Sequence, residues 1–449
     1  MSTIEKHDMT QGKILLPLVS FTIPLVLGNL FQLTYNAADS VIVGKYVGEQ
    51  ALAAVGTSTP IMNIAILLIS GMCMGASVLM SSQYGAKDYD TLSRQISTTM
   101  LAGCGFSVVF SLLMLLLANP VLRLIRVPET AIPEAAAYLR IIFMGLIFTF
   151  MYNFLANTMR ALGDSKTPLY FLVTSAFLNI FGDLFFVVVL RWGVAGSAIA
   201  TVCSEGLCCL LCGIYIKKKI PLLCLGKKWW VFDKSLLGKT VSYGSTSAMQ
   251  QVCLQLGKLI IQSVVNTQGV AVMAAFTAVN RVDDFAYTPQ QNIGHAMTTF
   301  LAQNKGAGHK EQMKKGFQTG LLIELVYSIG LFCVIWGLAP QIMTLFAEDG
   351  DAQVVSLGIS YLHLISWMYI LPGLTNGVQG FFRGIGDLKV TLYSTFMNMF
   401  GRVVAVFVMI RLLQMEFASL AWANMVGWIV MLLFEVPLLV KSMRNGECG

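Results

Sequence analysis

The stretch Ile14–Asp39, ILLPLVSFTIPLVLGNLFQLTYNAAD, decides the fold because it is apolar for most of its length and ends in a carboxylate. An α-helix rises about 1.5 Å per residue, so the segment is long enough to cross a bilayer. On this helix Gln32, Tyr35 and Asp39 share one face, unlike a lipid-facing stripe. Pro24 removes a backbone hydrogen bond at mid-span and predicts a kink. An acid, a polar face and a hinge in one span indicate a transport pathway.

The composition is that of an integral membrane protein. Of the 449 residues 56% are hydrophobic and only 12% are charged, and the mean hydropathy is +0.71. The polar start, MSTIEKHDMTQGK, is followed by an apolar run that is too long for a signal peptide and lacks a small-residue cleavage site. We therefore expect the first helix to be retained.

The sequence carries no enzyme motif. It contains no nucleophile with a supporting base, no G-K-[ST] phosphate loop and no histidine cluster. Cys209 and Cys212 have a metal-like spacing, but no second pair accompanies them, so packing is the expected role of the cysteines. We expect neither an enzyme nor a cofactor, and an ion gradient rather than ATP as the energy source.

Apolar length predicts an all-α protein with twelve transmembrane helices. The expected spans are 14–38, 51–82, 94–118, 134–157, 168–190, 194–216, 237–265, 270–301, 316–338, 353–380, 390–412 and 417–440. Most of the 30 lysines and arginines fall at the termini and in every second loop, so the positive-inside rule places both termini in the cytoplasm. The same rule explains the net charge of +7 without nucleic acid as a partner.

An internal repeat divides the spans into two lobes of six helices. Arg160-Ala-Leu-Gly-Asp-Ser-Lys166 recurs as Arg383-Gly-Ile-Gly-Asp-Leu-Lys389, and the same displacement relates Tyr138-Leu139 to Tyr361-Leu362. An even number of helices per repeat makes the repeat parallel, with a pseudo-twofold axis along the membrane normal. We expect an N-terminal lobe at 1–216, a cytoplasmic connection at 217–236 and a C-terminal lobe at 237–449, with a cavity between the lobes.

The motifs that carry a family resemblance lie in both halves. They are the two R-x-x-G-D-x-K turns, Asp39-Ser-Val-Ile-Val-Gly44 followed by Ala51-Leu-Ala-Ala-Val-Gly56, and Asn179-Ile-Phe-Gly-Asp183. The chain resembles the multidrug and toxic compound extrusion (MATE) family, and the resemblance extends from about residue 10 to 440. It implies a twelve-helix antiporter that expels organic cations in exchange for sodium ions or protons.

In the DinF-like branch of that family the N-terminal lobe carries a polar cluster. The matching positions here are Gln32, Tyr35 and Asp39 on the first helix, Asn179 and Asp183 on the fifth, and Thr201 on the sixth. The NorM-like branch has carboxylates on helices 7 and 10. Here helix 7 offers Gln250, Gln251 and Gln255, and helix 10 has no acid, so the resemblance does not extend to an ion site of that kind in the C-terminal lobe.

The depth of the acids can be read from the sequence alone. Asp39 stands six residues before the outer Lys45, Asp183 eight before the outer Arg191, and Thr201 ten after it. These positions lie about 9, 12 and 15 Å below the outer helix ends, so they converge on one level. Carboxylate, amide and hydroxyl oxygens suit a small cation, and two nearby carboxylates can equally share a proton. The coupling ion is therefore a proton or sodium, with Asp39, Asn179, Asp183 and Thr201 as the expected sodium ligands.

Further polar and aromatic side chains suit an adaptable substrate cavity. The expected cavity residues are Gln32, Tyr35, Asn36, Asn153, Phe154, Asn157, Glu205, Gln255, Phe276 and Tyr287. On the eighth helix we expect Arg281 to be neutralised by Asp283 and Asp284, a structural role. Lys258, Glu324 and Glu435 receive no role from the sequence.

The sequence thus predicts a secondary active efflux antiporter that works by alternating access. The runner-up is a flippase for lipid-linked saccharides or other amphiphiles, which we would expect to have more cations in its spans than this chain has. The expected setting is a plasma membrane, as in the bacterial inner membrane. The expected partners are organic cations and lipid, with the protein acting as a monomer.

Overall fold

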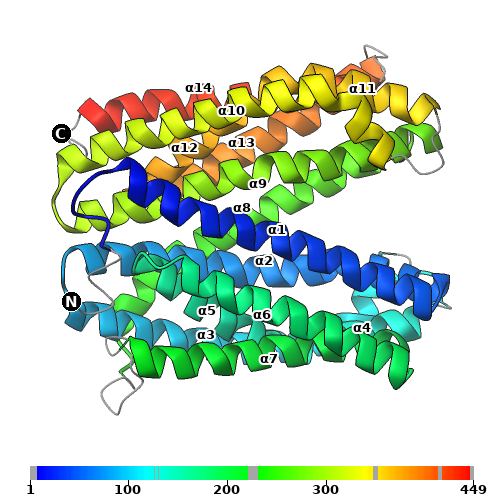
Figure 1. Ribbon diagram of the computed structural model, residues 1–449, viewed down its shortest axis with the longest axis horizontal. Helices are drawn as coiled ribbons and strands as arrows, with labels where there is room; N and C mark the ends of the chain where they lie inside the picture. Colours follow the sequence, from blue (N-terminus) through cyan, green and yellow to red (C-terminus); the bar gives the residue numbers. More distant parts are fainter. Residues whose placement is uncertain are drawn as a thin grey trace. The chain divides into compact units, whose positions relative to one another are not determined.

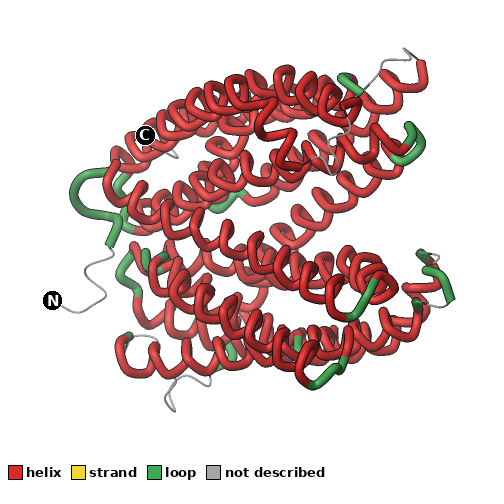
Figure 2. Tube along the Cα trace, turned by 45° about the vertical axis from the view of Figure 1, so that its right-hand side comes forward, coloured by secondary structure: helices red, strands yellow, loops and turns green. Residues whose placement is uncertain are grey.

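The computed structural model describes residues 8–125, 127–129, 131–220, 231–346, 352–412 and 417–444. Within the described helices, the side chains at positions 36, 40, 49, 50, 52, 53, 346, 411 and 412 are not described. All regular structure across the described residues is helical, and none of it is strand (Figure 2). The predicted all-α class is confirmed.

The first half of the chain forms seven α-helices and one π-helical turn (Figure 1). They are α1 (Leu15–Tyr46), α2 (Glu49–Gly85), α3 (Tyr89–Leu124), α4 (Ile132–Met144), α5 (Leu146–Ala161), α6 (Lys166–Asp183), the π-turn η2 (Leu184–Val189) and α7 (Gly193–Lys219). α4 and α5 are bent by 47° at the one-residue break between them, and together they occupy one expected span.

The second half repeats this order. Its elements are α8 (Lys234–Val265), α9 (Val270–Gly306), α10 (Lys310–Phe346), α11 (Ala352–Ser366), the 3₁₀ turn η6 (Trp367–Tyr369), α12 (Ile370–Gly384), α13 (Leu388–Phe407), the π-turn η7 (Val408–Leu412) and α14 (Ser419–Arg444). A helix, or a helix with one break, therefore occupies each of the twelve expected spans.

Length and hydropathy single out most of these helices as membrane spans. Nine described helices pass such a test, and the bent pair α4–α5 adds a tenth. α8 and α9 are as long as the others but less apolar, because charged and amide side chains interrupt them. Polar side chains inside membrane spans usually lie in the protein interior or line a transport pathway. α8 and α9 are therefore helices in which functional residues are expected.

The chain divides into two compact units. Unit 1 contains Ile23–Ala248, and unit 2 contains Met9–Thr22 with the chain from Met249 onward. Two helices, α1 and α8, each run from one unit into the other, and the crossing in α1 lies next to Pro24. The domain limits expected from the sequence, with a connection at 217–236, stay a prediction, and residues 221–230 lie outside the described part of the chain.

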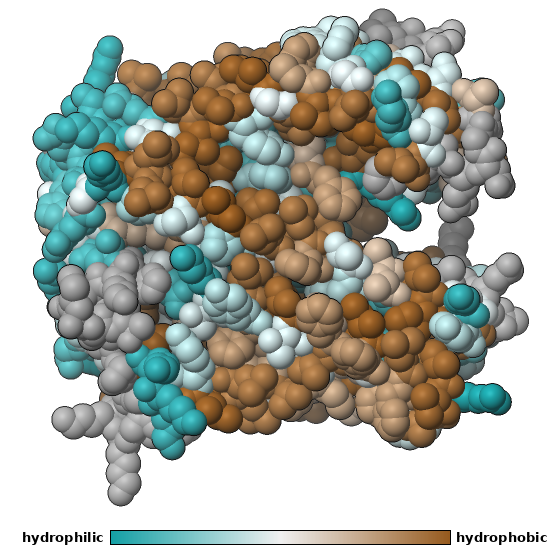
Figure 3. Space-filling model, viewed as in Figure 1, coloured by the Kyte–Doolittle hydropathy of each residue, from teal (hydrophilic) through white to brown (hydrophobic). Residues whose placement is uncertain are grey.

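Each unit has its own apolar core, and apolar side chains also cover its outer surface. Leu139, Phe143 and Leu146 are completely buried in unit 1, as are Leu362 and Ile365 in unit 2. Brown, hydrophobic side chains cover much of the helix faces visible in Figure 3, and teal, hydrophilic ones gather at the helix ends. This distribution suits lipid around the helices and water at their ends.

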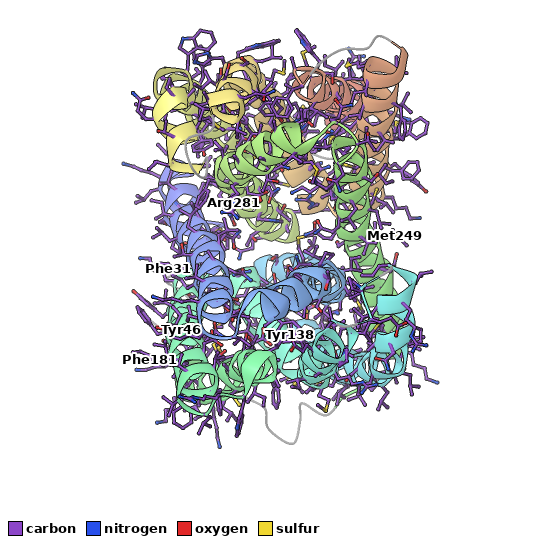
Figure 4. The ribbon with its side chains drawn as sticks, turned by 90° about the vertical axis from the view of Figure 1, so that its right-hand side faces the viewer. Phe31, Tyr46, Tyr138, Phe181, Met249 and Arg281 are labelled. Carbon is purple, nitrogen blue, oxygen red and sulfur yellow. The ribbon has the colours of Figure 1, made fainter. Side chains whose placement is uncertain are left out.

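Aromatic side chains contribute to the outer surface. Figure 4 labels three of them, Phe31 and Tyr46 on α1 and Phe181 on α6, and all three are exposed. Large exposed rings of this kind would be unfavourable in water but are ordinary against lipid. Their exposure is consistent with lipid rather than water around these parts of α1 and α6.

The internal repeat is visible in local geometry. Gly163 and Gly386, at corresponding positions of the two R-x-x-G-D-x-K turns, have φ values of +89° and +85°. Only glycine adopts this left-handed conformation without a steric cost, which explains why both turns contain it there. The π-turns η2 and η7 likewise follow corresponding helices, α6 and α13. Both R-x-x-G-D-x-K segments therefore form tight turns through a left-handed glycine.

Candidate functional site

The predicted ion-coupling residues lie on α1, α6 and α7 of unit 1. Asp183 is the last residue of α6, immediately before the π-turn η2. At the neighbouring Gly182, an added Cβ would lie 3.0 Å from the Cβ of Ala200 on α7. The missing side chain lets α6 and α7 approach closely at this level, in the way that small residues commonly bring spanning helices together.

Hydrogen bonds join the three helices. The Ser197 hydroxyl donates to Asp39 Oδ1 at 2.6 Å, which ties α7 to α1. Asn179 Nδ2 donates to Thr201 Oγ1 at 3.2 Å, which ties α6 to α7, and Thr201 Oγ1 donates to the Ser197 carbonyl at 3.2 Å. The structure thus brings together Asp39, Asn179 and Thr201 as predicted, and it adds Ser197.

Asp183 differs from Asp39 in its surroundings. Its exposed fraction is 0%, and neither of its carboxylate oxygens accepts a hydrogen bond from the described residues. Asn179 Oδ1, one helical turn earlier on α6, also has no partner there. Asp39 acts on Asp183 electrostatically, and no lysine or arginine of the described chain does.

The cluster therefore holds two carboxyl groups on which no described lysine or arginine acts. Burying an isolated carboxylate in a medium of low dielectric constant costs far more than an isolated hydrogen bond returns, so such a group is neutralised or paired. Neither oxygen of Asp183 nor Asn179 Oδ1 accepts a hydrogen bond from the described residues, and the Asp183 carboxyl lies within hydrogen-bond reach of the Asp39 carboxyl. A proton or a small cation bound here would satisfy them.

Tyr138 on α4 is a member of this cluster that the sequence did not assign to the site. Its hydroxyl lies 3.6 Å from Met62 Sδ, and Asp39 and Asp183 both act on it electrostatically. Figure 4 labels this side chain. The one signal was its place in the repeat opposite Tyr361. Ser197 was missed as well, although it stands one turn before Thr201 on the same helix face.

Glu205 on α7 is half-buried beside the cluster, and one of its oxygens accepts a hydrogen bond. The Thr149 hydroxyl of α5 donates to its Oε2 at 2.5 Å. Glu205 also acts electrostatically on Tyr35, which hydrogen-bonds Gln32 one turn earlier on α1. Gln32, Tyr35 and Glu205 thus lie near the acids as expected, whereas the side chain of Asn36 lies outside the described part of the chain.

The other predicted cavity residues of unit 1 make local contacts. Asn153 Nδ2 donates to the Thr149 carbonyl, and Asn157 Nδ2 donates to the Asn153 carbonyl, each at 2.8 Å. Phe154 is buried in the core of unit 1, with its ring stacked on Phe150. Their contact with substrate stays a prediction.

The predicted cavity residues of unit 2 are divided between surface and core. Gln255 is half-buried. Phe276 lies in the core of unit 2, and the Tyr287 ring packs edge-on against Tyr369 and Trp428. Their role in substrate binding also stays a prediction.

The expected neutralisation of Arg281 by its helix neighbours is wrong. Asp284 instead pairs with Lys258 of α8 at 3.4 Å, which gives Lys258 its partner. Asp283 is buried and accepts hydrogen bonds from the Tyr369 and Tyr361 hydroxyls, at 2.6 and 3.3 Å. No ion pair joins Arg281 to either acid among the described residues. Consecutive residues point to different sides of a helix, so each acid meets a different neighbour.

No group of three or more histidine, cysteine or acidic side chains that could hold a metal ion occurs in the described residues. The cluster of unit 1 has two carboxylates, supplemented by amide and hydroxyl oxygens. This donor set suits a proton or a monovalent hard cation better than a transition metal, which prefers imidazole or thiolate ligands.

Comparison with known proteins gives a family context. The sequence profile of the family described as MatE matches residues 24–185 and again 247–409, one match in each half of the repeat. The chain is 32% identical to the probable multidrug resistance protein YpnP of Bacillus subtilis over 392 residues, covering 87% of this chain and 86% of that protein. It is 28% identical to the probable multidrug resistance protein YoeA of the same organism over 389 residues, covering 85% and 82%.

A solved structure of similar fold is an outward-facing multidrug resistance MATE family transporter of the MOP superfamily. The two chains superpose with a TM-score of 0.91 at 22% sequence identity, covering 100% of this chain and 99% of the other. At this level of identity the likeness concerns the fold. It agrees with the twelve spans in two lobes.

Proposed function

The chain belongs to the multidrug and toxic compound extrusion (MATE) family of membrane transporters, and from this premise we propose that it exports organic cations in exchange for protons or sodium ions. It is a multi-pass transporter for small molecules and not an enzyme. The names of its relatives, which refer to multidrug resistance, support a broad substrate range. The exchange and its ion are the proposed part.

The observation that carries the proposal is the uncompensated carboxylate of Asp183. Neither oxygen of Asp183 accepts a hydrogen bond from the described residues, and its neighbour within the spanning region, Asp39, is also an acid. A structural acid would be paired with a cation or fully hydrogen-bonded. A pair of acids without a described cationic partner can bind and release a coupling ion, which is what an antiporter requires.

Coupling then follows from competition between two states of the protein. Binding of the ion at Asp39 and Asp183 neutralises the cluster and favours the state from which substrate leaves. Substrate binding favours the other state, because a ligand shifts an equilibrium only through its different affinity for the two states. Pro24 lies in α1 between the unit boundary and Asp39, so bending there would transmit the change along α1.

The test is ethidium efflux from energised cells that express the protein. We expect expression to lower ethidium accumulation, and we expect an ionophore that collapses the coupling gradient to abolish this effect. A proton-selective and a sodium-selective ionophore, used separately, identify the ion. Accumulation that is low with both gradients collapsed would contradict antiport.

Location and topology complete the proposal. We place the protein in the bacterial inner membrane as a monomer, with both termini in the cytoplasm, since the lysines and arginines follow the positive-inside rule. A cysteine introduced in the 160–166 turn and one in the 383–389 turn should both react with a membrane-impermeant reagent from the cytoplasmic side. Reaction of either from outside would contradict this topology.

A further inference from the structure

Glu324 stands in the middle of α10, in unit 2, and has no function in the mechanism above. Its exposed fraction is 1%. Neither carboxylate oxygen accepts a hydrogen bond from the described residues, and no cationic side chain within that part of the chain acts on it. An ionised carboxylate in this position would be a buried charge without compensation.

Polar side-chain atoms of α9 and α10 meet beside Gly373 of α12, and Glu324 is one of them. An added Cβ at Gly373 of α12 would lie 2.8 Å from Ser328 Oγ, 3.2 Å from Gln290 Nε2 and 3.4 Å from Glu324 Oε2. Gln290 belongs to α9 and has an exposed fraction of 0%. The glycine therefore leaves room for a small polar cluster formed by α9, α10 and α12.

The hydrogen bonds of this cluster are incomplete in a specific way. Gln290 Nε2 donates to Ser328 Oγ at 3.0 Å and to the Tyr369 carbonyl at 2.8 Å. Ser328 Oγ donates to the carbonyls of Glu324 and Tyr369, at 2.7 and 3.3 Å. The atoms left without a partner among the described residues are both Glu324 oxygens and Gln290 Oε1, which are all acceptors. The cluster lacks a donor.

Other titratable groups nearby do not supply positive charge. Glu324 acts electrostatically on Tyr327 of α10. The Tyr327 hydroxyl donates to the Ala286 carbonyl. On the described elements packed against α10, the titratable groups facing this region of the chain are Asp283, Tyr287 and His295 on α9, Tyr361 and His363 on α11, and Tyr369 in η6, and none of them acts electrostatically on Glu324. Arg383, the basic residue of α12, donates to Gln379 instead.

A proton suits this cluster better than a metal cation. A sodium ion would need several oxygens at once, but the Gln290 amide presents its nitrogen toward the point where the cluster meets. A protonated carboxyl group provides one O–H donor and carries no charge, and it keeps one acceptor oxygen. It therefore removes the buried charge and supplies the missing donor.

We propose that Glu324 is a second proton-binding site, formed in unit 2 with Gln290, Ser328 and the bare backbone of Gly373, and that it takes up and releases one proton during transport. Uptake forms one O–H bond on the carboxyl group with a proton from water, and release breaks that bond and returns the proton to water. Proton binding does not depend on the proposed antiport; only its timing within the cycle does.

Infrared spectroscopy of the purified full-length protein in lipid nanodiscs tests the binding. We expect the wild type at neutral pH to show a carbonyl band of a protonated carboxylic acid that Glu324→Gln lacks. Glu311→Gln is the matched control, because Glu311 is on the same helix but is exposed and paired with Lys315 at 2.9 Å. The proposal is overturned if Glu324→Gln loses the band of an ionised carboxylate instead. It is also overturned if the spectra of the variant and the wild type do not differ.

Two further measurements keep the proposal falsifiable. Gly373→Ala retains the acid but places a methyl group against it, so the carbonyl band of Glu324 should shift in frequency. An unchanged band would contradict the placement of Glu324 in a cluster with Gln290, Ser328 and Gly373. Difference spectra on adding ethidium should show the Glu324 band decreasing. A band that responds neither to ethidium nor to pH is a permanent structural proton and contradicts release. Because the spectra need no ion gradient, failure of antiport in cells leaves this test intact.

Discussion

The buried acids Asp183 in unit 1 and Asp283 in unit 2 differ in one respect that matters, their hydrogen bonds. Each lies near a tyrosine from the same position of the repeat, Tyr138 for Asp183 and Tyr361 for Asp283. Asp283 accepts hydrogen bonds from two tyrosine hydroxyls. Asp183 accepts none from the described residues.

This difference separates a structural acid from a functional one. A carboxylate with two hydroxyl donors is part of a satisfied network, and Asn424 Nδ2 extends that network by donating to Tyr361 at 3.0 Å. An acid without donors costs free energy in the folded protein unless an ion is present. The same helical scaffold can therefore carry both kinds of acid, and the partner atoms rather than the fold assign the role.

The largest expected effect tests that separation directly. Asp183→Asn and Asp39→Asn should abolish coupled efflux, with ethidium export falling on the order of tenfold or more, because each removes the charge that the coupling ion neutralises. Asp283→Asn should retain coupled efflux and instead lower the unfolding free energy by about 1–3 kcal/mol, since it disturbs a satisfied buried network.

The measurement is ethidium export together with substrate-induced ion release from purified protein. Ion release should vanish in the two unit 1 variants and persist in Asp283→Asn. Undiminished release from the Asp39→Asn, Asp183→Asn double variant would place the coupling site elsewhere, with Glu205 as the next candidate. Lost coupling in Asp283→Asn would erase the distinction between the two acids.

A second prediction sharpens the geometry around Asp39. Ser197→Ala removes the hydroxyl that donates to Asp39 Oδ1 at 2.6 Å. Hydrogen bonds to charged groups contribute about 1.5–3 kcal/mol, so the ion concentration for half-maximal efflux should change on the order of tenfold. Ser204→Ala is the control, because that hydroxyl donates to the Thr201 carbonyl rather than to an acid. Equal behaviour of the two variants would argue against Ser197 as a positioning residue.

A smaller effect distinguishes the two repeated turns. Asp164 Oδ1 accepts hydrogen bonds from the backbone N–H groups of Lys166 and Thr167, at 3.1 and 3.0 Å, and so caps α6. Asp387 makes no such bond at the start of α13. Asp164→Ala should lower the unfolding free energy by about 1 kcal/mol, and Asp387→Ala should change it by less than about 0.5 kcal/mol. Thermal unfolding in detergent compares them, and the reverse order would contradict the prediction.

The smallest expected effect depends on pH. Asp88 precedes α3, outside the spans, and its hydrogen bonds with Thr91 lower the pKa of the carboxyl group. A depressed folded-state pKa means that the stabilisation is present above the unfolded-state value and is lost as the pH falls through the folded-state value. The melting temperature of Asp88→Ala should thus lie slightly below that of the wild type at neutral pH and equal it in acid. A difference that persists in acid would assign the effect to something other than the charge.

Most of the fold could be predicted from the sequence. The twelve spans follow from apolar length, and the two glycine turns follow from the repeated motif, because both depend on neighbours along the chain. No comparable sequence pattern predicted the helix breaks, which lie between α4 and α5 and at η6. None predicted the π-turns after α6 and α13 either. They depend on how helices pack, which hydropathy does not encode.

The site was predicted in part. Asp39, Asn179 and Thr201 meet as expected because helical periodicity and depth place them on converging faces. Ser197 was missed because a serine in a span is an ordinary interhelical residue until its partner is known. The expected partners of Arg281 were wrong for a related reason, since closeness in sequence is no substitute for contact in space.

The sequence by itself determined that this chain is an all-α membrane protein of two repeated halves, with acids at one depth in the first. Those properties depend on hydrophobic length, the helical period and turn residues, which act locally. Only the tertiary structure decided which acid has donors and which has none. Its partners come from helices far apart in the chain, as with Asp39 and Ser197, or Asp283 and Tyr369. The rotation of each helix about its axis sets those pairs, and packing fixes that rotation.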